Sequence, residues 1–293
     1  PAGNIYFGLG CDAWNGAYRI NKDTGVSQYN VNSERGTIIR LSPDWKRRDI
    51  ISTGLRFPVS LAFNAAGDLF CSDQEGATWL ANGNPFDELL HIQPGRHYGF
   101  PPRHPRHLPG VIDEPSVFDY GPQHQSTCGV HFNEPTGGGT ATFGPAWWKG
   151  DALVAGESRG KIWRTKLAKT ASGYVAKNDL FACVSMLTID AVPTPQGDLL
   201  VACHSGAPDW GTGPQGEGRV FKISYTGKAS PQPVLGTTVT YTIANIPANA
   251  LLSVRLLSLG AAPSIDLDKL RAHKDKVVGK LTGGLAGMAK GRK

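Results

Sequence analysis

The sequence is poor in charged residues and lacks any long apolar run. Asp, Glu, Lys and Arg make up 18% of the 293 residues, below the roughly 25% that is usual for soluble proteins. No stretch of about 18 consecutive apolar residues is present, so the sequence contains no recognisable transmembrane helix. The opening residues PAGNIYFG have neither a basic nor an apolar segment, and we expect no signal peptide there.

Cysteine is scarce, and its spacing excludes several familiar sites. The five cysteines are Cys11, Cys71, Cys128, Cys183 and Cys203. No CxxC, CxxCH or zinc-type spacing occurs, which leaves no motif for a covalently attached haem or a zinc ribbon. An odd, scattered set allows at most two disulfides and one free thiol. The alternative is that these side chains are small buried apolar groups.

The basic charge of the chain is confined to its last residues. The formal net charge is +6, but residues 269–293 alone contribute +7 through eight Lys and Arg against the single acid Asp275. Residues 1–268 therefore carry a net charge of −1. The body of the protein offers no basic groove for nucleic acid, and we expect no nucleic-acid partner.

Turn-forming residues are abundant, and the turns repeat. The 37 glycines and 21 prolines indicate many turns and few long helices, while 40% apolar residues suffice for a core. Four segments share one pattern: a turn with Gly, a short apolar strand, and a partner strand of the form Gly-x-Φ-Φ-Arg/Lys-Φ, where Φ is apolar. The first strands lie at 2–10, 66–74, 149–158 and 196–206, and the partners lie at 35–42, 87–95, 159–167 and 217–227.

This repeat predicts an all-β protein of the β-propeller type. A single blade cannot bury both faces of its sheet, but blades stacked around an axis bury them against each other. We expect about four blades over residues 1–226. Residues 227–262 predict a β extension or the closure of the last blade, and 263–293 predict a basic tail that is helical at 264–282 and disordered beyond.

Polar residues follow the first strand of three of the repeats. Strand ends that meet at one mouth of a propeller are a usual place for a site, so these residues are candidates for one. The alternative is that they are ordinary turn residues. The candidates for a substrate mouth are Asp73, Glu75, Glu157, His204 and Asp209, with Gln74 and Arg159 beside them.

A Pro-rich stretch at 95–132 predicts a long loop rather than a helix. Six of the eight histidines fall between residues 91 and 131. Pro105 separates His104 from His107, so no helix presents these two together, and we interpret them as part of a packed or solvated loop rather than a metal site.

A family likeness runs through the same segments. GNIYFGLG, RGTIIRLSPD, STGLRFPVSLAFNAAGDLFCSDQ and DELLHIQPGRHYGFP follow one another between residues 3 and 101. In this order they resemble the motifs of the glucose/sorbosone dehydrogenase family, quinoprotein sugar dehydrogenases with a six-bladed propeller. HQSTCGVHF, WWKGDALVAGESRGKIWR, IDAVPTPQGDLLVACHSG and GRVFKISY extend the resemblance to residue 226. The chain is identified as a truncated or divergent member of that family.

The resemblance implies a site for pyrroloquinoline quinone (PQQ) and Ca²⁺. It assigns cofactor contacts to Arg56, Gln74 and Arg159, and it places metal ligands at Asp87 and Glu88. The catalytic His of the family would lie before Pro1, so the catalytic residue of this chain is unknown.

Several positions depart from the family pattern. Phe57 replaces an Asn that contacts the cofactor, Ser158 or Arg159 stands where the family has a Lys, and Leu187 and Ile189 stand where it has two Arg. PQQ carries three carboxylates, and burying them without cationic partners is costly. These departures predict that the chain does not bind PQQ tightly.

Three functions remain open from the sequence. The first is a PQQ-dependent sugar or alcohol dehydrogenase, which transfers a hydride from the substrate hydroxyl to the quinone and is either active or inactive in this chain. The second is a non-catalytic propeller, a binding or assembly module that kept the fold and lost the site. Separately, four repeats fall short of six blades, and we expect missing N-terminal blades or a partner chain to complete the ring. The third is a lactonase-like hydrolase, with one divalent metal held by residues such as Glu75, Asp87, Glu157 and Asp209. The family likeness also predicts a periplasmic or secreted protein.

Overall fold

The structure is a computed structural model that describes residues 3–11, 23–24, 33–76, 85–100, 114–122, 125–184, 186–205 and 216–227. All of these residues belong to the first of two compact units, Pro1–Pro231. The second unit, Gln232–Lys293, lies outside the described residues. The predicted β extension, apart from Gly227, and the predicted helical tail therefore stay predictions.

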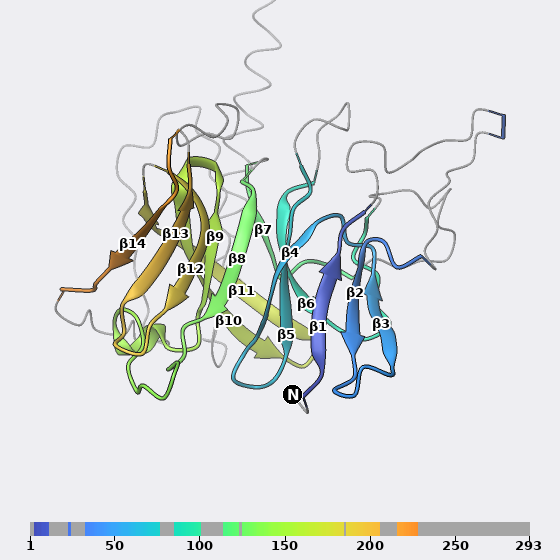
Figure 1. The fold of residues 1–293 in the computed structure, drawn as a ribbon, viewed down its shortest axis with the longest axis horizontal. Coiled ribbons are helices and arrows are strands. Elements are labelled where there is room, and N and C mark those ends of the chain that lie inside the picture. Colours follow the sequence, from blue (N-terminus) through green and yellow to red (C-terminus); the bar gives the residue numbers. More distant parts are fainter. Residues whose placement is uncertain are drawn as a thin grey trace, which may run out of the picture. The chain divides into compact units, whose positions relative to one another are not determined.

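The described part of the chain is all-β, as the repeat predicts. Fourteen strands form four antiparallel sheets, shown in Figure 1, and the helical segments among the described residues are two short 3-10 turns, η1 (Ala146–Trp148) and η2 (Ser158–Gly160). In that part of the chain no helix is long and apolar enough to cross a membrane.

The four sheets follow one another along the chain. The first contains β1 (Ile5–Leu9), β2 (Thr37–Leu41) and β3 (Arg48–Thr53), and the second contains β4 (Pro58–Phe63), β5 (Leu69–Asp73), β6 (Asp87–Ile92) and β7 (Phe118–Tyr120). The third contains β8 (Thr127–Phe132), β9 (Ala152–Gly156), β10 (Lys161–Thr170) and β11 (Gly173–Cys183), and the fourth contains β12 (Leu187–Pro193), β13 (Leu199–His204) and β14 (Arg219–Ile223).

The strand pairs predicted from the repeat are confirmed. Strand β1 pairs with β2, β5 with β6, β9 with β10, and β13 with β14, each antiparallel. In the second, third and fourth sheets a further strand precedes the predicted pair, namely β4, β8 or β12. These preceding strands contact one another in succession, β4 with β8 and β8 with β12.

Two of the Gly turns have the same hydrogen bonds, which explains why the pattern is visible in the sequence. In the turn before β5, Gly67 N donates to Asn64 O at 2.9 Å and Asn64 N donates to Asp68 O at 3.0 Å. The turn before β13 repeats both bonds with Gly197, Thr194 and Asp198. Both glycines have a positive φ, +82° and +85°, which glycine adopts without strain.

Among the described residues, the core consists of three apolar clusters, each between two successive sheets. Alternate residues of one strand enter different clusters: Leu69 and Cys71 pack toward the first sheet, and Phe70 packs toward the third. Leu153 likewise faces the fourth sheet, whereas its neighbours Ala152 and Val154 face the second. Strands buried on both faces are expected for stacked blades.

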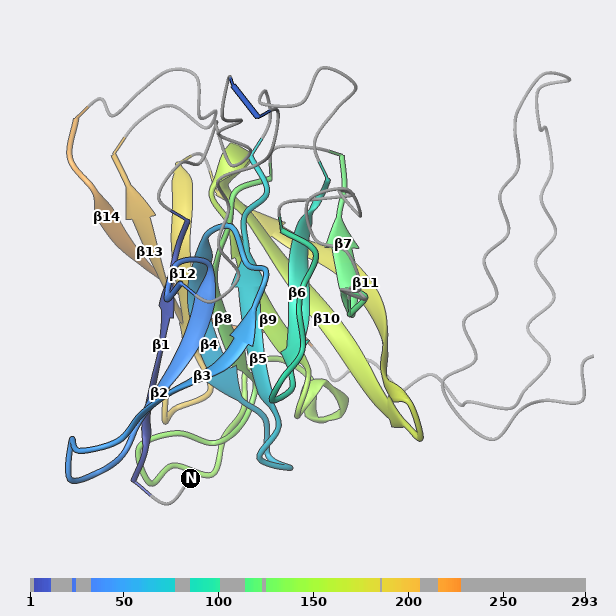
Figure 2. The same ribbon diagram turned by 90° about the vertical axis from the view of Figure 1, so that its right-hand side faces the viewer.

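The third sheet also reaches the second through the long β10–β11 hairpin, which extends beyond its neighbours in Figure 2. Near its tip, Lys169 Nζ lies 2.7 Å from Asp68 Oδ2, and the Tyr174 hydroxyl donates to the same oxygen. Asp68 belongs to the turn before β5, so this contact joins two sheets at the end opposite Asp73.

One expectation from the sequence is wrong. Composition predicts a loop over the stretch 95–132, but this stretch supplies strands β7 and β8. In β8 every residue except His131 is buried, and Val130 and Phe132 enter the cluster between the second and third sheets. Proline and histidine dominate the composition of this stretch and hide the six-residue apolar alternation of TCGVHF. Residues 101–113, with His104 and His107, lie outside the described residues.

The five cysteines all lie among the described residues, and none of them forms a disulfide. Cys71, Cys128 and Cys203 are buried, Cys11 is half-buried and Cys183 is exposed. The interpretation of cysteine as a small buried apolar residue holds for three of the five.

The inter-sheet packing predicts a large difference between two leucines of the third sheet. Leu153 is fully buried and Leu180 is 51% exposed. We expect Leu153→Ala to lower the free energy of unfolding by about 2–5 kcal/mol, because it removes buried methyl groups and leaves a cavity. The matched change Leu180→Ala is expected to cost under about 1 kcal/mol. Urea unfolding of the full chain measures both, and equal losses would contradict the two-faced burial of β9.

Candidate functional site

The polar candidates gather because successive sheets present the same strand ends at one edge. Strand β5 ends at Asp73, β9 ends just before Glu157, and β13 ends at His204. The strands that precede them start at this edge: Pro58 of β4 pairs with Asp73, and Thr127 of β8 pairs with Gly156. The predicted mouth is therefore built from three sheets.

Asp73 is the structural centre of this edge. It is 1% exposed, and its two carboxylate oxygens accept backbone hydrogen bonds, Oδ2 from Arg56 N at 2.9 Å and Oδ1 from Phe57 N at 2.7 Å. The carboxylate thus fixes the chain just before β4. This role explains why an ionisable residue ends a strand that is otherwise uncharged and buried.

Arg56 is buried beneath the turn that follows β5. Its side chain is 6% exposed, and Nη1 donates to Gln74 O at 2.6 Å. A Cβ placed on Gly76 would lie 2.9 Å from Nη2, and Gly76 has a φ of +70°. The turn 74–76 therefore closes over the guanidinium, and glycine at position 76 makes that approach possible.

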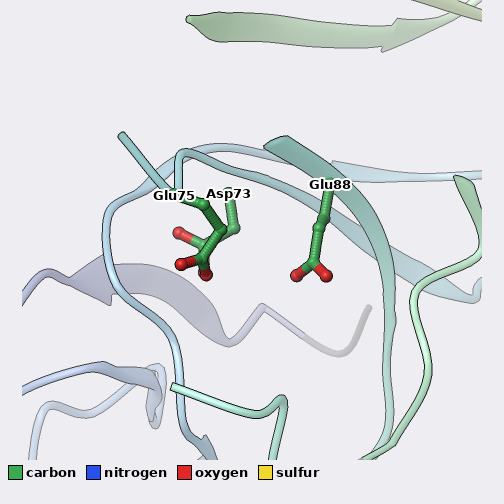
Figure 3. Close-up of side chains that lie close together, drawn as sticks. All are labelled: Asp73, Glu75 and Glu88. Atoms are coloured by element: carbon green, nitrogen blue, oxygen red, sulfur yellow. The ribbon is translucent and has the colours of Figure 1, made fainter. Parts of the chain in front are cut away.

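Three carboxylates converge beside Arg56. Ligand oxygens of Asp73, Glu75 and Glu88 all lie within 4.8 Å of one another. Figure 3 shows Asp73 and Glu75 side by side, with Glu88 extending from the next strand toward the same space. Glu88 joins them because it pairs directly with Asp73 across the β5–β6 ladder.

Burial makes this cluster resist ionisation. Loss of hydration raises the pKa of Asp73 to about 7, although the amides of Arg56 and Phe57 favour its charged form. Burial, and then the Asp73 carboxylate, raise the pKa of Glu75 well above its usual value, against the pull of Arg56. Burial and the Glu75 carboxylate raise the pKa of Glu88 likewise. A single guanidinium does not offset the clustered acids, so protons or a cation are favoured there.

Asp87 connects the second and third sheets. Its Oδ1 accepts from Glu75 N at 2.8 Å and its Oδ2 accepts from Thr127 N at 3.3 Å. Gln74 makes a parallel connection, donating from Nε2 to Thr127 O at 2.9 Å. The structure therefore gives Asp87 and Gln74 roles in joining sheets; their predicted metal and cofactor contacts stay predictions.

The remaining candidates lie along the third and fourth sheets. Glu157 is 7% exposed, and its backbone N donates to Ser126 O at 2.9 Å. Burial raises the pKa of Glu157, and His204 acts in the opposite direction, which places these two close enough to interact. Arg159 is exposed, with a φ of +65° in η2. Asp209 lies outside the described residues.

Sequence reasoning missed Thr127 at this edge, where Lys161 also lies. Thr127, at the start of β8, contacts Asp87 and Gln74 through its backbone. Lys161 Nζ, at the start of β10, donates to Gln125 Oε1. The only sequence signal for Thr127 is its place in the segment HQSTCGVHF, which lies in the stretch predicted as a loop.

The edge offers oxygen ligands for a hard cation. Ca²⁺ takes six to eight oxygen ligands, commonly carboxylates and carbonyls, and Asp73, Glu75 and Glu88 supply carboxylate oxygens at mutual distances that one ion could span. This acidic cluster does not suit an anionic ligand. The guanidinium beside it, that of Arg56, already donates a hydrogen bond to Gln74 O.

No protein-family model matches the chain. Solved propellers do match its fold. A glucose dehydrogenase-type oxidoreductase from Thermus thermophilus superposes with a TM-score of 0.54 at 22% identity, covering 76% of this chain and 62% of that one. The PQQ-bound aldose sugar dehydrogenase of Streptomyces coelicolor gives 0.50 at 21%, covering 75% and 58%. The soluble aldose sugar dehydrogenase of Escherichia coli gives 0.50 at 16%, covering 76% and 61%.

These likenesses define the class of the chain: it is a propeller of the fold found in PQQ-dependent aldose and glucose dehydrogenases. At this level of identity the likeness shows the fold alone. The chain spans about 60% of the length of these structures. A curated relative, dihydrolipoyl dehydrogenase of Haemophilus influenzae, is 38% identical over 97 residues, which amount to 28% of this chain and 20% of that protein.

The buried acids predict a pH dependence of stability. The pKa of Asp73 rises from 3.8 to about 7 on folding, so the folded state binds more protons in this window. Stability is therefore highest below the unfolded pKa and falls as the pH rises toward about 7. We expect Glu75→Gln to raise stability relative to the wild type by roughly 1 kcal/mol or more at about pH 8, and by less at about pH 5.

Thermal unfolding in EDTA at the two pH values measures this difference. The exposed carboxyl Glu217 provides the control, because Glu217→Gln removes one negative charge from the surface rather than from the cluster. A Glu75→Gln effect that is the same at both pH values would show that the cluster does not titrate in this window.

Proposed function

We propose that this chain is a ligand-binding propeller of the sugar dehydrogenase class, which takes a sugar or alcohol at the mouth lined by Asp73, Glu75 and Glu88 and does not bind PQQ tightly. The observation that carries the proposal is the convergence of these three carboxylates within 4.8 Å at one edge of a propeller of this fold. The aldose sugar dehydrogenase of Streptomyces coelicolor, which shares the fold, is a PQQ-bound enzyme.

Carboxylates suit a polyhydroxylated ligand because each oxygen accepts hydrogen bonds from hydroxyl groups. Desolvation at the edge strengthens such bonds relative to water. A carboxyl with a pKa near 7, such as that of Asp73, is present in both protonation states near neutral pH and can accept or donate a proton. These properties support recognition of neutral sugars and alcohols.

The described residues fit PQQ poorly. Leu187, which stands at a position where the family has Arg, is 2% exposed and apolar, and Ile189 beside it is half-buried. Phe57 provides no hydrogen-bonding side chain where the family has Asn, and the guanidinium of Arg56 is bonded to Gln74 O. Three quinone carboxylates would meet an acidic cluster with few cations, which is unfavourable.

The same cluster fits Ca²⁺, which Asp73, Glu75 and Glu88 could hold through carboxylate oxygens. A bound divalent ion would favour the charged forms of these groups and would supply an electrophilic centre for ligand oxygens. This feature also favours a second candidate function, a metal-dependent hydrolase of the lactonase type.

We expect no saturable oxidation of aldoses when the full chain is titrated with PQQ and Ca²⁺ in a dye-reduction assay. The loss of two charge-assisted contacts to the quinone carboxylates weakens PQQ binding by about 3–6 kcal/mol, on the order of 10²–10⁴-fold. Calorimetric titration with D-glucose in the same buffer is expected to show binding without turnover. Turnover that saturates at sub-micromolar PQQ would instead establish a quinoprotein dehydrogenase.

Metal content and lactone hydrolysis, measured on the same purified protein, distinguish the lactonase alternative from the sugar-binding propeller. A divalent metal retained through purification, together with lactone hydrolysis that EDTA abolishes, would favour the hydrolase over the sugar-binding propeller. Absence of both, with sugar binding present, would favour the proposed function.

We also propose that the protein works in the periplasm or is secreted, on the basis of its resemblance to quinoproteins that act there. Immunodetection in fractions of the source organism is expected to find it outside the cytosol. Full-length protein confined to the cytosolic fraction would refute this location.

A further inference from the structure

Trp45 is a strained and solvent-exposed aromatic residue at the tip of the β2–β3 hairpin. Its side chain is 70% exposed, the highest value among the large apolar residues that the structure describes. Its φ is +62°, in the left-handed region that a bulky side chain occupies only at an energetic cost. An exposed indole and a strained backbone thus coincide at one residue, and strain of this kind concentrates at functional segments.

Hydrogen bonds hold the hairpin tip in this conformation. Ser42 N donates to Arg47 O and Trp45 N donates to Ser42 O, each at 2.9 Å. Ser42 Oγ accepts from Arg47 N at 2.9 Å and donates to Asp44 Oδ1 at 2.6 Å, and the same carboxylate oxygen accepts from Lys46 N at 3.2 Å. The backbone at the tip is therefore preorganised, which lowers the entropy that a partner of Trp45 has to supply on docking.

The tip lies at the end of the sheets opposite the mouth. Cys11, two residues after β1 ends at Leu9, donates from its backbone N to Arg56 O at 2.8 Å, beside the mouth. Leu9 pairs with Thr37 at the start of β2, so the connection from β2 to β3 lies at the far end, at the lower edge of Figure 1. A partner that contacts Trp45 therefore leaves the mouth free.

Exposed cations lie at the same end of the sheets, which we call the cationic end. Four ion pairs there share one arrangement: the cation is 58–70% exposed and its acid is 22–31% exposed. These pairs are Arg47–Asp49, Lys149–Glu134, Lys169–Asp68 and Lys222–Asp198, from strand ends and turns of all four sheets. Exposed Lys46 adds a further positive charge beside Trp45. A surface that approaches this end meets the cations before the acids.

The chain thus separates its charges between two ends. Asp73, Glu75 and Glu88 converge at the mouth, whereas basic side chains extend into solvent at the cationic end. The net charge of −1 over residues 1–268 hides this polarity. Exposed cations attract an anionic partner and orient it toward that end.

The residue types at the cationic end fit lipid better than a folded protein. An indole has an apolar body and one N–H donor, which suits the boundary between headgroups and acyl chains of a bilayer. Lys and Arg near it are attracted to anionic headgroups. A stable protein interface buries an area on the order of 1,000 Å² with apolar residues at its centre, whereas the hairpin tip offers one aromatic side chain among charged ones.

We propose that the cationic end docks on an anionic lipid surface, with the Trp45 indole in the headgroup region and Lys46, Arg47 and the other exposed cations against lipid phosphates. The contact is peripheral and reversible, because one aromatic anchor and a few cations bind weakly. It directs the mouth away from the bilayer toward solvent. The proposal does not depend on which ligand the mouth takes.

Co-sedimentation of the full chain with lipid vesicles tests the proposal. The probes are vesicles of phosphatidylcholine alone and vesicles of equimolar phosphatidylcholine and phosphatidylglycerol. We expect binding to the anionic vesicles that is lost at high salt, because salt screens the exposed cations. We expect Trp45→Ala to weaken this binding roughly tenfold and Lys46→Gln about fivefold.

Two matched variants serve as controls. Phe86→Ala removes an aromatic ring that is 42% exposed at the mouth end, next to Asp87. Lys177→Gln removes an exposed cation from the middle of the β10–β11 hairpin. Both are expected to leave vesicle binding unchanged. Trp45→Gly is expected to lose binding without any loss of thermal stability, because glycine adopts the positive φ without strain.

The basic residues 269–293, with a charge of +7, provide the competing explanation for vesicle binding. Binding to anionic vesicles that neither Trp45→Ala nor Lys46→Gln weakens would assign the contact to those residues and overturn the proposal. Absence of binding to anionic vesicles, or equal binding to neutral ones, would also overturn it. If the chain ignores both kinds of vesicle but binds heparin through Trp45 and Lys46, the partner is a polyanion other than lipid.

Discussion

The burial of single strands on both of their faces is the constraint on which this molecule depends. Leu69 and Cys71 pack against one neighbouring sheet while Phe70 packs against the other, and β9 repeats this arrangement with Leu153 between Ala152 and Val154. No sheet could leave its neighbours without exposing an apolar face. Sheets held face to face in this way keep their strands aligned, so the strand ends form a common edge.

That common edge makes polar residues serve two purposes. Asp73 holds the amides of Arg56 and Phe57, and Asp87 joins Glu75 to Thr127 across two sheets. The same carboxylates that complete the backbone hydrogen bonds also supply the acidity of the mouth. Amides and one guanidinium lie beside these carboxylates and partly compensate their buried negative charge. The negative charge that is not compensated raises the pKa values of Asp73 and Glu75.

The mouth differs in chemistry from what its family likeness implies. Arg56, the retained member of the implied cofactor set, is covered by the turn that ends at Gly76 and bonds to Gln74 O. Leu187 is buried and apolar. The edge therefore combines a fold shared with quinone-dependent sugar dehydrogenases with a cluster of buried acids, and this combination supports the proposal that the edge takes cations and neutral hydroxyl compounds rather than a tricarboxylate. A shared fold does not fix a shared site, because the site depends on a few side chains at strand ends.

The sequence by itself determined the strand pairs of the four blades, because their signals are local: a glycine turn, an apolar alternation and a partner strand within the next few tens of residues. It also indicated Asp73, Glu75 and Glu157 as candidates, because polar residues directly follow apolar strands.

Strand β8 was missed, since its alternation is short and surrounded by proline and histidine. Only the tertiary structure decided that Glu88 joins Asp73 and Glu75, that Asp87 connects two sheets, and that Phe57 is exposed. These facts follow from strand register and from the stacking of sheets, and both are set by contacts between residues far apart in the chain, which no local pattern records.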